Sequence, residues 1–352
     1  MKKNNIILIL VLLLLVIIIT YREMSREMAK KEGLQKAPEL TGISGYFNTE
    51  NIKISDLKGK VVLVDFWTYS CINCIRTLPH LIEWDKKYRD MGLVIIGVHT
   101  PEFDFEKKYE NVQDAIDRHW IEYAIVQDND YKTWNAYSNR FWPHKYLIDH
   151  KGNIRYDHIG EGEYEETEKK IQELLMEIDK KAGDVSISKL EDNTPKVRTT
   201  SELYAGFGFA LPRGQNIGNK GGLQSGNVVD YKTEGDFKKD VIYLEGKWRS
   251  NEDNLRAQDN RSASIILGFT ANNVNLVADS LNDKPVKVDV LINGDYIDET
   301  QAGSDVEFDG KRSYITVDKP RLYNLFNGYY GTYLLKLRTD SKDFAFNAFT
   351  FG

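Results

Sequence analysis

The two cysteines of this 352-residue sequence form the motif Cys71-Ile72-Asn73-Cys74. They follow the apolar run from Val61 to Trp67, which predicts a buried strand, and a helical pattern comes after them. At this junction the first sulfur lies in the first helical turn, where unpaired N–H groups and the helix dipole favour a thiolate. The second sulfur lies one turn further, close enough to form a disulfide. The spacing predicts a thiol–disulfide exchange centre, with Cys71 as the nucleophile and Cys74 as the resolving thiol.

Two other uses of this cysteine pair are less consistent with the sequence. A structural zinc site needs four ligands, and the six histidines supply no second pair at metal-ligand spacing. A structural disulfide across so short a loop would restrict the unfolded chain little. We therefore expect no cofactor and no metal, only a redox-active disulfide between Cys71 and Cys74.

The segment from Val64 to Cys74 resembles the active-site segment of the thioredoxin superfamily. Asp65 lies six residues before Cys71, where thioredoxins keep a buried carboxylate beneath the second cysteine. Trp67 matches the tryptophan that flanks the site, and Pro79 matches the proline that kinks the active-site helix. The resemblance implies a thioredoxin fold.

A second segment, residues 141–153, is similar to the thioredoxin strand that opens with a cis-proline and ends in an Asp-x-x-Gly turn. The resemblance implies a cis bond at Trp142-Pro143, beside the disulfide. From the residues alone, an ordinary trans proline at a strand start is the alternative. His144 follows this proline, and we expect a satisfied surface histidine there in preference to a substrate contact.

Within the superfamily the sequence most resembles the TlpA/redoxin branch, and in particular the thioredoxin part of DipZ-type proteins. The likeness covers roughly residues 40–352, and it includes later phrases similar to the β-sandwich of DipZ-type chains: Glu202–Gly206, Gly246–Trp248, Asn273–Val277 and Phe349–Gly352. Two residues differ from the TlpA pattern. TlpA-type reductases often carry an acidic residue at the position of Thr77, and many carry an amide at the position of Asp65. The sequence therefore leaves open whether the protein reduces or oxidises its substrates. Only one apolar run, Ile6 to Ile19, approaches the length that spans a membrane, so a multi-span membrane electron donor would be a separate polypeptide.

The role of Asp65 follows from its place in an apolar strand. Burying a carboxylate is costly, and desolvation raises its pKa, so Asp65 is expected to accept the proton of Cys74. The alternative is a solvated strand residue. Trp67 is expected to be partly core and partly a wall of the site.

The N-terminus carries Lys2 and Lys3 and then an uninterrupted aliphatic run, Ile6 to Ile19. No small-x-small cleavage site follows it, so we expect an uncleaved membrane anchor within residues 1–25, with a cleaved signal peptide as the alternative. The short basic segment before the run and the redox motif place the rest of the chain outside the cytoplasm. The basic residues after the run oppose this orientation.

Two domains are expected after the anchor. Residues 36–182 alternate strands and helices as a thioredoxin-like domain requires, and a Gly-, Ser- and Pro-containing linker follows. Residues 200–352 hold short apolar runs between turn residues, which predicts an all-β sandwich of the jelly-roll kind. The expected runs are 241–244, 264–269, 286–292, 314–317, 332–337 and 344–346.

The net charge of −6 and the absence of a basic stripe exclude nucleic acid as a partner. We expect a membrane-anchored, extracytoplasmic thiol–disulfide oxidoreductase that reduces protein disulfides, with protein thiols and disulfides as its partners. The alternatives are a disulfide oxidase or isomerase, and a surface glycan-binding protein with an accessory redox domain. For the glycan alternative, Trp248, Tyr329 and Tyr330 would form a sugar-stacking face, although such aromatics are more often core.

Overall fold

A computed structural model describes residues 33–352 of the chain, which fall into two compact units. The first comprises the residues up to Phe66, His80–Thr100 and Glu122–Leu190. The second comprises Trp67–Pro79, Pro101–Ile121 and Glu191–Gly352. The segment with both cysteines thus belongs to the same unit as the C-terminal half of the chain.

The predicted anchor, residues 1–25, lies outside the described residues. From residue 33 onward, the structure contains no helix whose length and apolar character would allow it to span a bilayer.

A seven-stranded sheet runs through the first half of the described chain, in the order β1-β7-β6-β3-β4-β5-β2. β4 pairs in parallel with β5, whereas β6 pairs antiparallel with both β3 and β7. The strands are β1 (Gln35–Lys36), β2 (Gly45–Phe47), β3 (Val61–Trp67), β4 (Leu93–His99), β5 (Ala124–Gln127), β6 (His144–Ile148) and β7 (Asn153–Ile159). This arrangement confirms the thioredoxin fold.

The centre of the sheet is buried because β3 has an apolar residue at six of its seven positions, and all seven are buried. A strand covered on both faces reads as a continuous hydrophobic run. Phe66 contacts the rings of Trp134, Tyr137 and Tyr146 edge-on, with centroids 5.4–5.8 Å apart. These aromatic contacts form part of the core of the first unit.

The helices of this half are α2 (Ile72–Tyr88), α3 (Tyr109–Arg118), α4 (Lys132–Ala136) and α5 (Tyr164–Met176), with short 3-10 turns η1 (Ile54–Leu57), η2 (Arg89–Met91), η3 (Asp104–Lys107) and η4 (Lys180–Asp184). α2 continues through Pro79, the residue that matches the proline which kinks the active-site helix of thioredoxins. A proline inside a helix removes one backbone hydrogen bond and kinks or breaks the helix.

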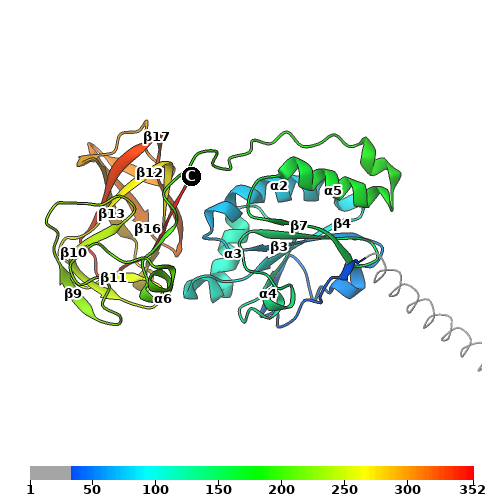
Figure 1. Cartoon of the computed structure of the whole chain (residues 1–352), viewed down its shortest axis with the longest axis horizontal. Helices are drawn as coiled ribbons and strands as arrows, with labels where there is room; N and C mark the ends of the chain where they lie inside the picture. Colours follow the sequence, from blue (N-terminus) through cyan, green and yellow to red (C-terminus); the bar gives the residue numbers. More distant parts are fainter. Residues whose placement is uncertain (1–32) are drawn as a thin grey trace, which may run out of the picture. The chain divides into compact units, whose positions relative to one another are not determined.

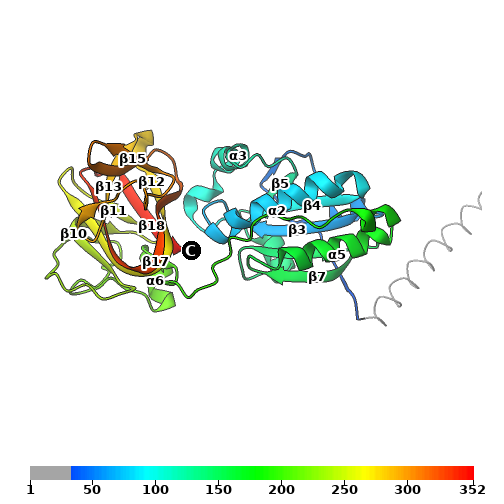
Figure 2. The same cartoon turned by 90° about the horizontal axis from the view of Figure 1, so that it is seen from above.

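Glu168 of α5 joins that helix to the part of α2 beyond His80 within the first unit. Its buried carboxylate accepts hydrogen bonds from Trp84 Nε1 at 3.2 Å and from the Tyr88 hydroxyl at 2.7 Å. Burial alone raises the pKa of Glu168, but the hydrogen bonds from Lys87, Ser188 and Tyr88 outweigh it and lower the pKa. In Figures 1 and 2, α5 and α2 lie side by side over one face of the sheet, and Figure 1 shows α4 at the opposite face.

The C-terminal part of the second unit is β-rich, as predicted (Figure 2). Its strands are hydrogen-bonded in the order β15-β16-β13-β17-β12-β10-β11-β18-β8. Its elements are β8 (Leu203–Tyr204), α6 (Phe207–Ala210), η5 (Leu211–Arg213), β9 (Val228–Tyr231), β10 (Ile242–Ser250), β11 (Leu255–Ala257), β12 (Ala263–Ser280), η6 (Leu281–Asp283), β13 (Val286–Ile292), β14 (Asp295–Tyr296), β15 (Val306–Asp309), β16 (Arg312–Val317), β17 (Arg321–Thr339) and β18 (Phe344–Phe351).

Two strands are much longer than their apolar runs predict. β12 has 18 residues and β17 has 19, and they pair antiparallel along most of their length. Register shifts near Asn273 and Asn275 mark irregularities of the bulge type, which bend a strand without ending it. The first half of β12 pairs with β10, and its second half pairs with β18.

The proposed sugar-stacking face is not a single surface. Trp248 is fully buried, and its Nε1 donates to the carbonyl of Glu245 at 2.9 Å, whereas Tyr329 is 87% exposed. Trp248 therefore belongs to the core of the β-rich region, as we expected for such aromatics, and the alternative of an exposed sugar-stacking face that includes Trp248 is wrong.

Candidate active site

The two cysteines lie at the start of α2, one just before the helix and one in its first turn. The Cys71 carbonyl accepts the N–H of Ile75 at 3.0 Å, and the Cys71 N–H donates to Thr68 at 3.3 Å. A tight turn thus leads from β3 into the helix. Cys71 is partly exposed, whereas Cys74 is only 1% exposed.

The sulfur of Cys71 takes the place of an N-cap side chain. The N–H of Cys74 donates to Cys71 Sγ at 3.4 Å, so one of the unpaired donors of the first turn points at this sulfur. Negative charge at a helix N-terminus is stabilised by roughly 0.3–1 kcal/mol. The geometry therefore favours attack by the more exposed sulfur, Cys71, and keeps Cys74 beneath the surface.

Glu106 is a site residue that the sequence analysis missed. It lies in η3, is fully buried, and its Oε1 accepts hydrogen bonds from the Ser70 hydroxyl at 2.6 Å and the Ser70 N–H at 3.3 Å. Its Oε2 accepts the N–H groups of Glu102 at 2.6 Å and Phe103 at 2.9 Å. Glu106 thus anchors the residue that immediately precedes Cys71 to the segment 101–121.

Burial raises the pKa of Glu106 and outweighs the hydrogen bonds that Ser70 and Thr68 contribute in the opposite direction. No local sequence signal marks this residue, because a glutamate in a segment of helical spacing is usually solvated. Its only hint is its place in the insert between Val98 and Tyr123, which distinguishes this chain from a minimal thioredoxin pattern.

Asp65 is buried, as predicted, and the solvated alternative is wrong. It lies in β3 opposite Lys145 of β6 and is 1% exposed. Burial raises the pKa of Asp65 to about 7, although the charge of Lys145 opposes this rise. The ammonium of Lys145 donates to the carbonyl of Gly160 at 2.9 Å. A carboxyl group that titrates near neutrality is suited to moving a proton.

The predicted proline segment adopts the expected backbone, with a cis bond between Trp142 and Pro143. The Trp142 Nε1 donates to the carbonyl of Thr100 at 3.1 Å, and its ring lies 4.3 Å from that of Trp134. These contacts hold the half-buried indole in place. Trp67, by contrast, is fully buried, so it contributes core packing and no exposed wall.

His144 is satisfied but lies in the interior, so our expectation of a surface histidine is wrong. Its Nδ1 lies 2.6 Å from Asn139 Oδ1, and its Nε2 lies 3.0 Å from Asp157 Oδ2. Burial lowers the pKa of His144, and the neighbouring Asp157 partly opposes this change. Because both ring nitrogens have partners, the residue is structural.

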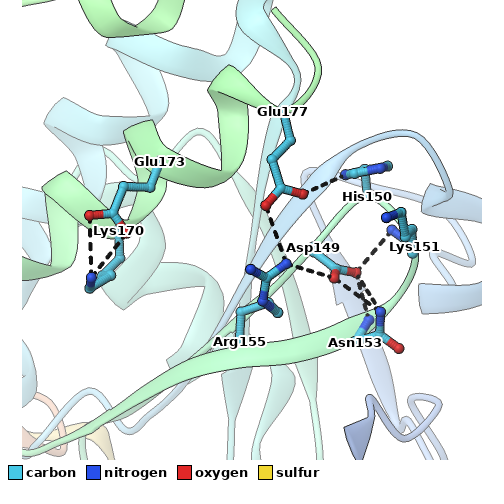
Figure 3. Close-up of polar contacts among 8 residues, drawn as sticks. All are labelled: Asp149, His150, Lys151, Asn153, Arg155, Lys170, Glu173 and Glu177. Carbon is cyan, nitrogen blue, oxygen red and sulfur yellow. Dashed lines mark hydrogen bonds and ion pairs between the residues drawn. The ribbon is translucent and has the colours of Figure 1, made fainter. Parts of the chain in front are cut away.

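The Asp-x-x-Gly turn between β6 and β7 is organised by Asp149, as Figure 3 shows. Its carboxylate accepts the N–H groups of Lys151 and Asn153, both at 2.9 Å, and pairs with Arg155 at 3.2 Å. Gly152 has φ +82°, a conformation that favours glycine. Burial alone raises the pKa of Asp149, but the hydrogen bonds from Asn153, Arg155 and Lys151 lower it overall.

The acidic and basic side chains around this turn pair with one another. Glu177 contacts Arg155 at 3.2 Å and His150 at 3.3 Å, and Lys170 contacts Glu173 at 2.9 Å (Figure 3). Across residues 33–352, no three His, Cys, Asp or Glu side chains gather in a way that could hold a metal ion.

Comparison with known proteins places these features in a family. Residues 34–157 match the AhpC/TSA family, and residues 200–352 match the family described as thioredoxin like C-terminal domain. The chain is 32% identical over 126 residues to thiol-disulfide oxidoreductase ResA of Halalkalibacterium halodurans, an alignment that covers 36% of this chain and 68% of that protein. The chain belongs to the thioredoxin-like thiol–disulfide oxidoreductases.

Two further relatives show how far this membership extends. Protein DipZ of Mycobacterium bovis is 40% identical over 255 residues, which is 71% of this chain and 36% of DipZ. Thiol-disulfide oxidoreductase YkuV of Bacillus subtilis is 28% identical over 145 residues, 41% of this chain and 97% of YkuV. The chain thus spans about a third of the length of DipZ, and the predicted resemblance to DipZ-type proteins is confirmed.

Proposed function

We propose that this chain is a membrane-anchored, extracytoplasmic thiol–disulfide oxidoreductase that reduces protein disulfides through Cys71 and Cys74. The observation that carries the proposal is the donation of the Cys74 N–H to Cys71 Sγ at the start of α2. This contact and the helix terminus favour negative charge on the more exposed sulfur, which is what an attacking thiol requires.

In the proposed reaction the Cys71 thiolate attacks one sulfur of a substrate disulfide. A Cys71–substrate disulfide forms, and the other substrate sulfur leaves as a thiolate. Cys74 then loses its proton and attacks Cys71 Sγ, which forms the Cys71–Cys74 disulfide and releases the second substrate thiolate. Two electrons pass from the enzyme dithiol to the substrate, and a separate thiol donor must return them.

We propose that Asp65 accepts the proton of Cys74 in the second step. The burial of Asp65 supports this proposal, because it raises the pKa of the carboxyl group to about 7. A base with a pKa near the working pH transfers protons most effectively.

The reducing direction rests on the resemblance to ResA- and DipZ-type proteins, and an oxidase or isomerase is the rival. The reduction potential of the Cys71–Cys74 pair, measured against a glutathione buffer, decides between them. A value well above that of glutathione would refute the reductase and favour the oxidase.

The remaining parts of the proposal concern organisation. Anchoring outside the cytoplasm rests on the aliphatic run within residues 1–25, and a separate membrane protein is proposed as the electron donor. We propose a thioredoxin-like domain over 36–182 and a β-sandwich over 200–352, in which β12 belongs to both layers because its halves pair with different strands. We propose that the sandwich docks partner proteins.

Trapping of covalent intermediates tests the exchange reaction. Cys74→Ser should accumulate mixed disulfides with added protein substrates, because the resolving sulfur is missing, and Cys71→Ser should not. Non-reducing gels and mass spectrometry of full-length variants measure this directly. Trapping by Cys71→Ser but not by Cys74→Ser would reverse the two roles.

A further inference from the structure

A cavity of about 580 Å³ lies within the second compact unit and reaches the active-site helix. Its lining includes Ile72 of α2, Arg118 at the end of α3, Asn275 of β12 and Asn324 of β17. Ile72 directly follows Cys71, and adjacent Cα atoms are about 3.8 Å apart. A ligand in this cavity therefore lies close to the nucleophilic cysteine.

A chain of amide groups in the cavity wall has a defined orientation. The N–H of Ser304 donates to Asn324 Oδ1 at 2.9 Å, so the NH₂ group of Asn324 must face the other way. That group donates to Asn273 Oδ1 at 3.2 Å and to Asn275 Oδ1 at 2.9 Å. Asn275 consequently directs its own NH₂ group away from Asn324.

The NH₂ group of Asn275 is a donor that awaits an acceptor. Asn275 is 1% exposed, and within residues 33–352 no acceptor lies within hydrogen-bonding distance of its Nδ2. Buried polar groups in native proteins nearly always have a partner.

The charge of the cavity wall indicates which kind of ligand the cavity favours. The side chains that line the cavity include three guanidinium groups, from Arg76, Arg118 and Arg321, and one carboxylate, that of Asp305, which pairs with Arg321 at 2.8 Å. Burial lowers the pKa of Arg118, and the like charge of Arg321 lowers it further. Burial and the charge of Arg118 lower the pKa of His119 to about 4, so this side chain is neutral at neutral pH. The wall carries excess positive charge.

We propose that this cavity binds an acidic peptide segment that flanks the disulfide of the substrate, with a carboxylate of that segment held by Arg118. The inference rests on the proposed function, because a substrate bonded to Cys71 must extend past Ile72. Amide donors also suit the carbonyl groups of a peptide, and the cavity volume falls within the 300–1,000 Å³ or so typical of ligand sites. Selectivity for acidic residues near the substrate disulfide follows.

Two peptides that share one intrachain disulfide test this selectivity. They differ only in glutamate or glutamine beside each cysteine, and reduced full-length protein in mild detergent is mixed with each. Charge-assisted hydrogen bonds contribute enough for a difference of about tenfold. We expect kcat/KM to be about tenfold higher for the glutamate peptide, and this advantage to fall with added salt.

Arg118→Gln should remove the advantage of the glutamate peptide, so that kcat/KM becomes similar for the two peptides. Arg249→Gln makes the same charge change at an exposed residue outside the cavity and should alter neither rate. Equal kcat/KM values for both peptides, in wild type and Arg118→Gln alike, would overturn the proposal. So would competition by a neutral oligosaccharide that slows both peptides equally.

A binding experiment separates this inference from the proposed function. The same peptides with both cysteines replaced by alanine cannot exchange disulfides, so calorimetry with them reports the cavity alone. Tighter binding of the glutamate form by wild type, lost in Arg118→Gln, supports the cavity site even if neither disulfide peptide is reduced. Equal binding of both forms overturns it, even if both disulfides are reduced.

Discussion

Replacing Asp65 by asparagine removes a carboxylate whose ionisation opposes folding. The pKa of Asp65 rises from 3.8 to about 7 in the folded protein, because burial disfavours its charged form. An acid with a raised folded-state pKa keeps its proton more tightly in the folded state. This contribution to stability is therefore fully present below about pH 4 and is lost as the pH rises to about 7.

The size of this effect follows from the two pKa values. Each pKa unit corresponds to about 1.4 kcal/mol, so at pH 8 the ionised carboxylate costs the folded state up to about 4 kcal/mol. Asp65→Asn should therefore be more stable than wild type at pH 8 by as much as this amount, and similar to it at pH 4. Urea unfolding of the full chain in mild detergent between pH 4 and 8 measures the difference.

The same substitution tests the catalytic proposal. Without a proton acceptor, resolution of the mixed disulfide should slow by about a hundredfold, the lower range of general-base effects, while its formation with Cys71 should not change. Rapid-quench single-turnover experiments separate these steps. Asp90→Asn, which removes an exposed carboxylate, is the matched control. A pH profile of stability that is identical in wild type and Asp65→Asn would refute the argument, and unchanged resolution would leave Asp65 without a catalytic role.

Two further predictions concern buried carboxylates of the second unit. In Glu106→Gln, an NH₂ group replaces one carboxylate oxygen and faces the Ser70 hydroxyl or the Phe103 N–H, which are themselves donors. The substitution should lower the free energy of unfolding by about 1–3 kcal/mol. It should also slow thiol–disulfide exchange, because it displaces Ser70. The hydroxyl of Tyr204 lies 2.7 Å from Glu102 Oε1 and 2.8 Å from Glu202 Oε2, and its single hydrogen serves only one of them. Burial, and then the charge of Glu202, raises the pKa of Glu102 to about 8. The free energy of unfolding should therefore decrease as the pH rises from about 4.5 to 8. In Glu102→Gln this decrease should be smaller.

A matched control for both predictions lies nearby in the chain. Glu110→Gln changes an exposed glutamate of α3 and should leave urea midpoints and exchange rates as in wild type. If Glu106→Gln behaves like this control, the anchoring role of Glu106 is wrong. A pH profile of Glu102→Gln that matches wild type would mean that burial and Glu202 do not raise the pKa of Glu102.

Prediction from sequence succeeded where one residue pattern decides the outcome. The strands at 61–67 and 286–292 were predicted with their exact bounds, because runs of branched apolar residues need burial and turn residues bound them. Prediction fell short for β12 and β17. Asn272, Asn273 and Asn275 interrupt the apolar pattern there, and only pairing along the full strand shows that these amides lie within it.

What the sequence by itself determined is the chemistry: a cysteine pair at helical spacing behind a buried strand, and a carboxylate placed inside that strand. These depend on local spacing and on the cost of burying charge, which act within a few residues. Tertiary structure alone decided that Glu106 anchors Ser70, that His144 lies in the interior, and that the amides of β12 and β17 meet arginines in one cavity. The Glu106 and cavity contacts join residues dozens to hundreds of positions apart. No local propensity encodes any of these contacts, because the energy of each depends on burial that the folded chain creates.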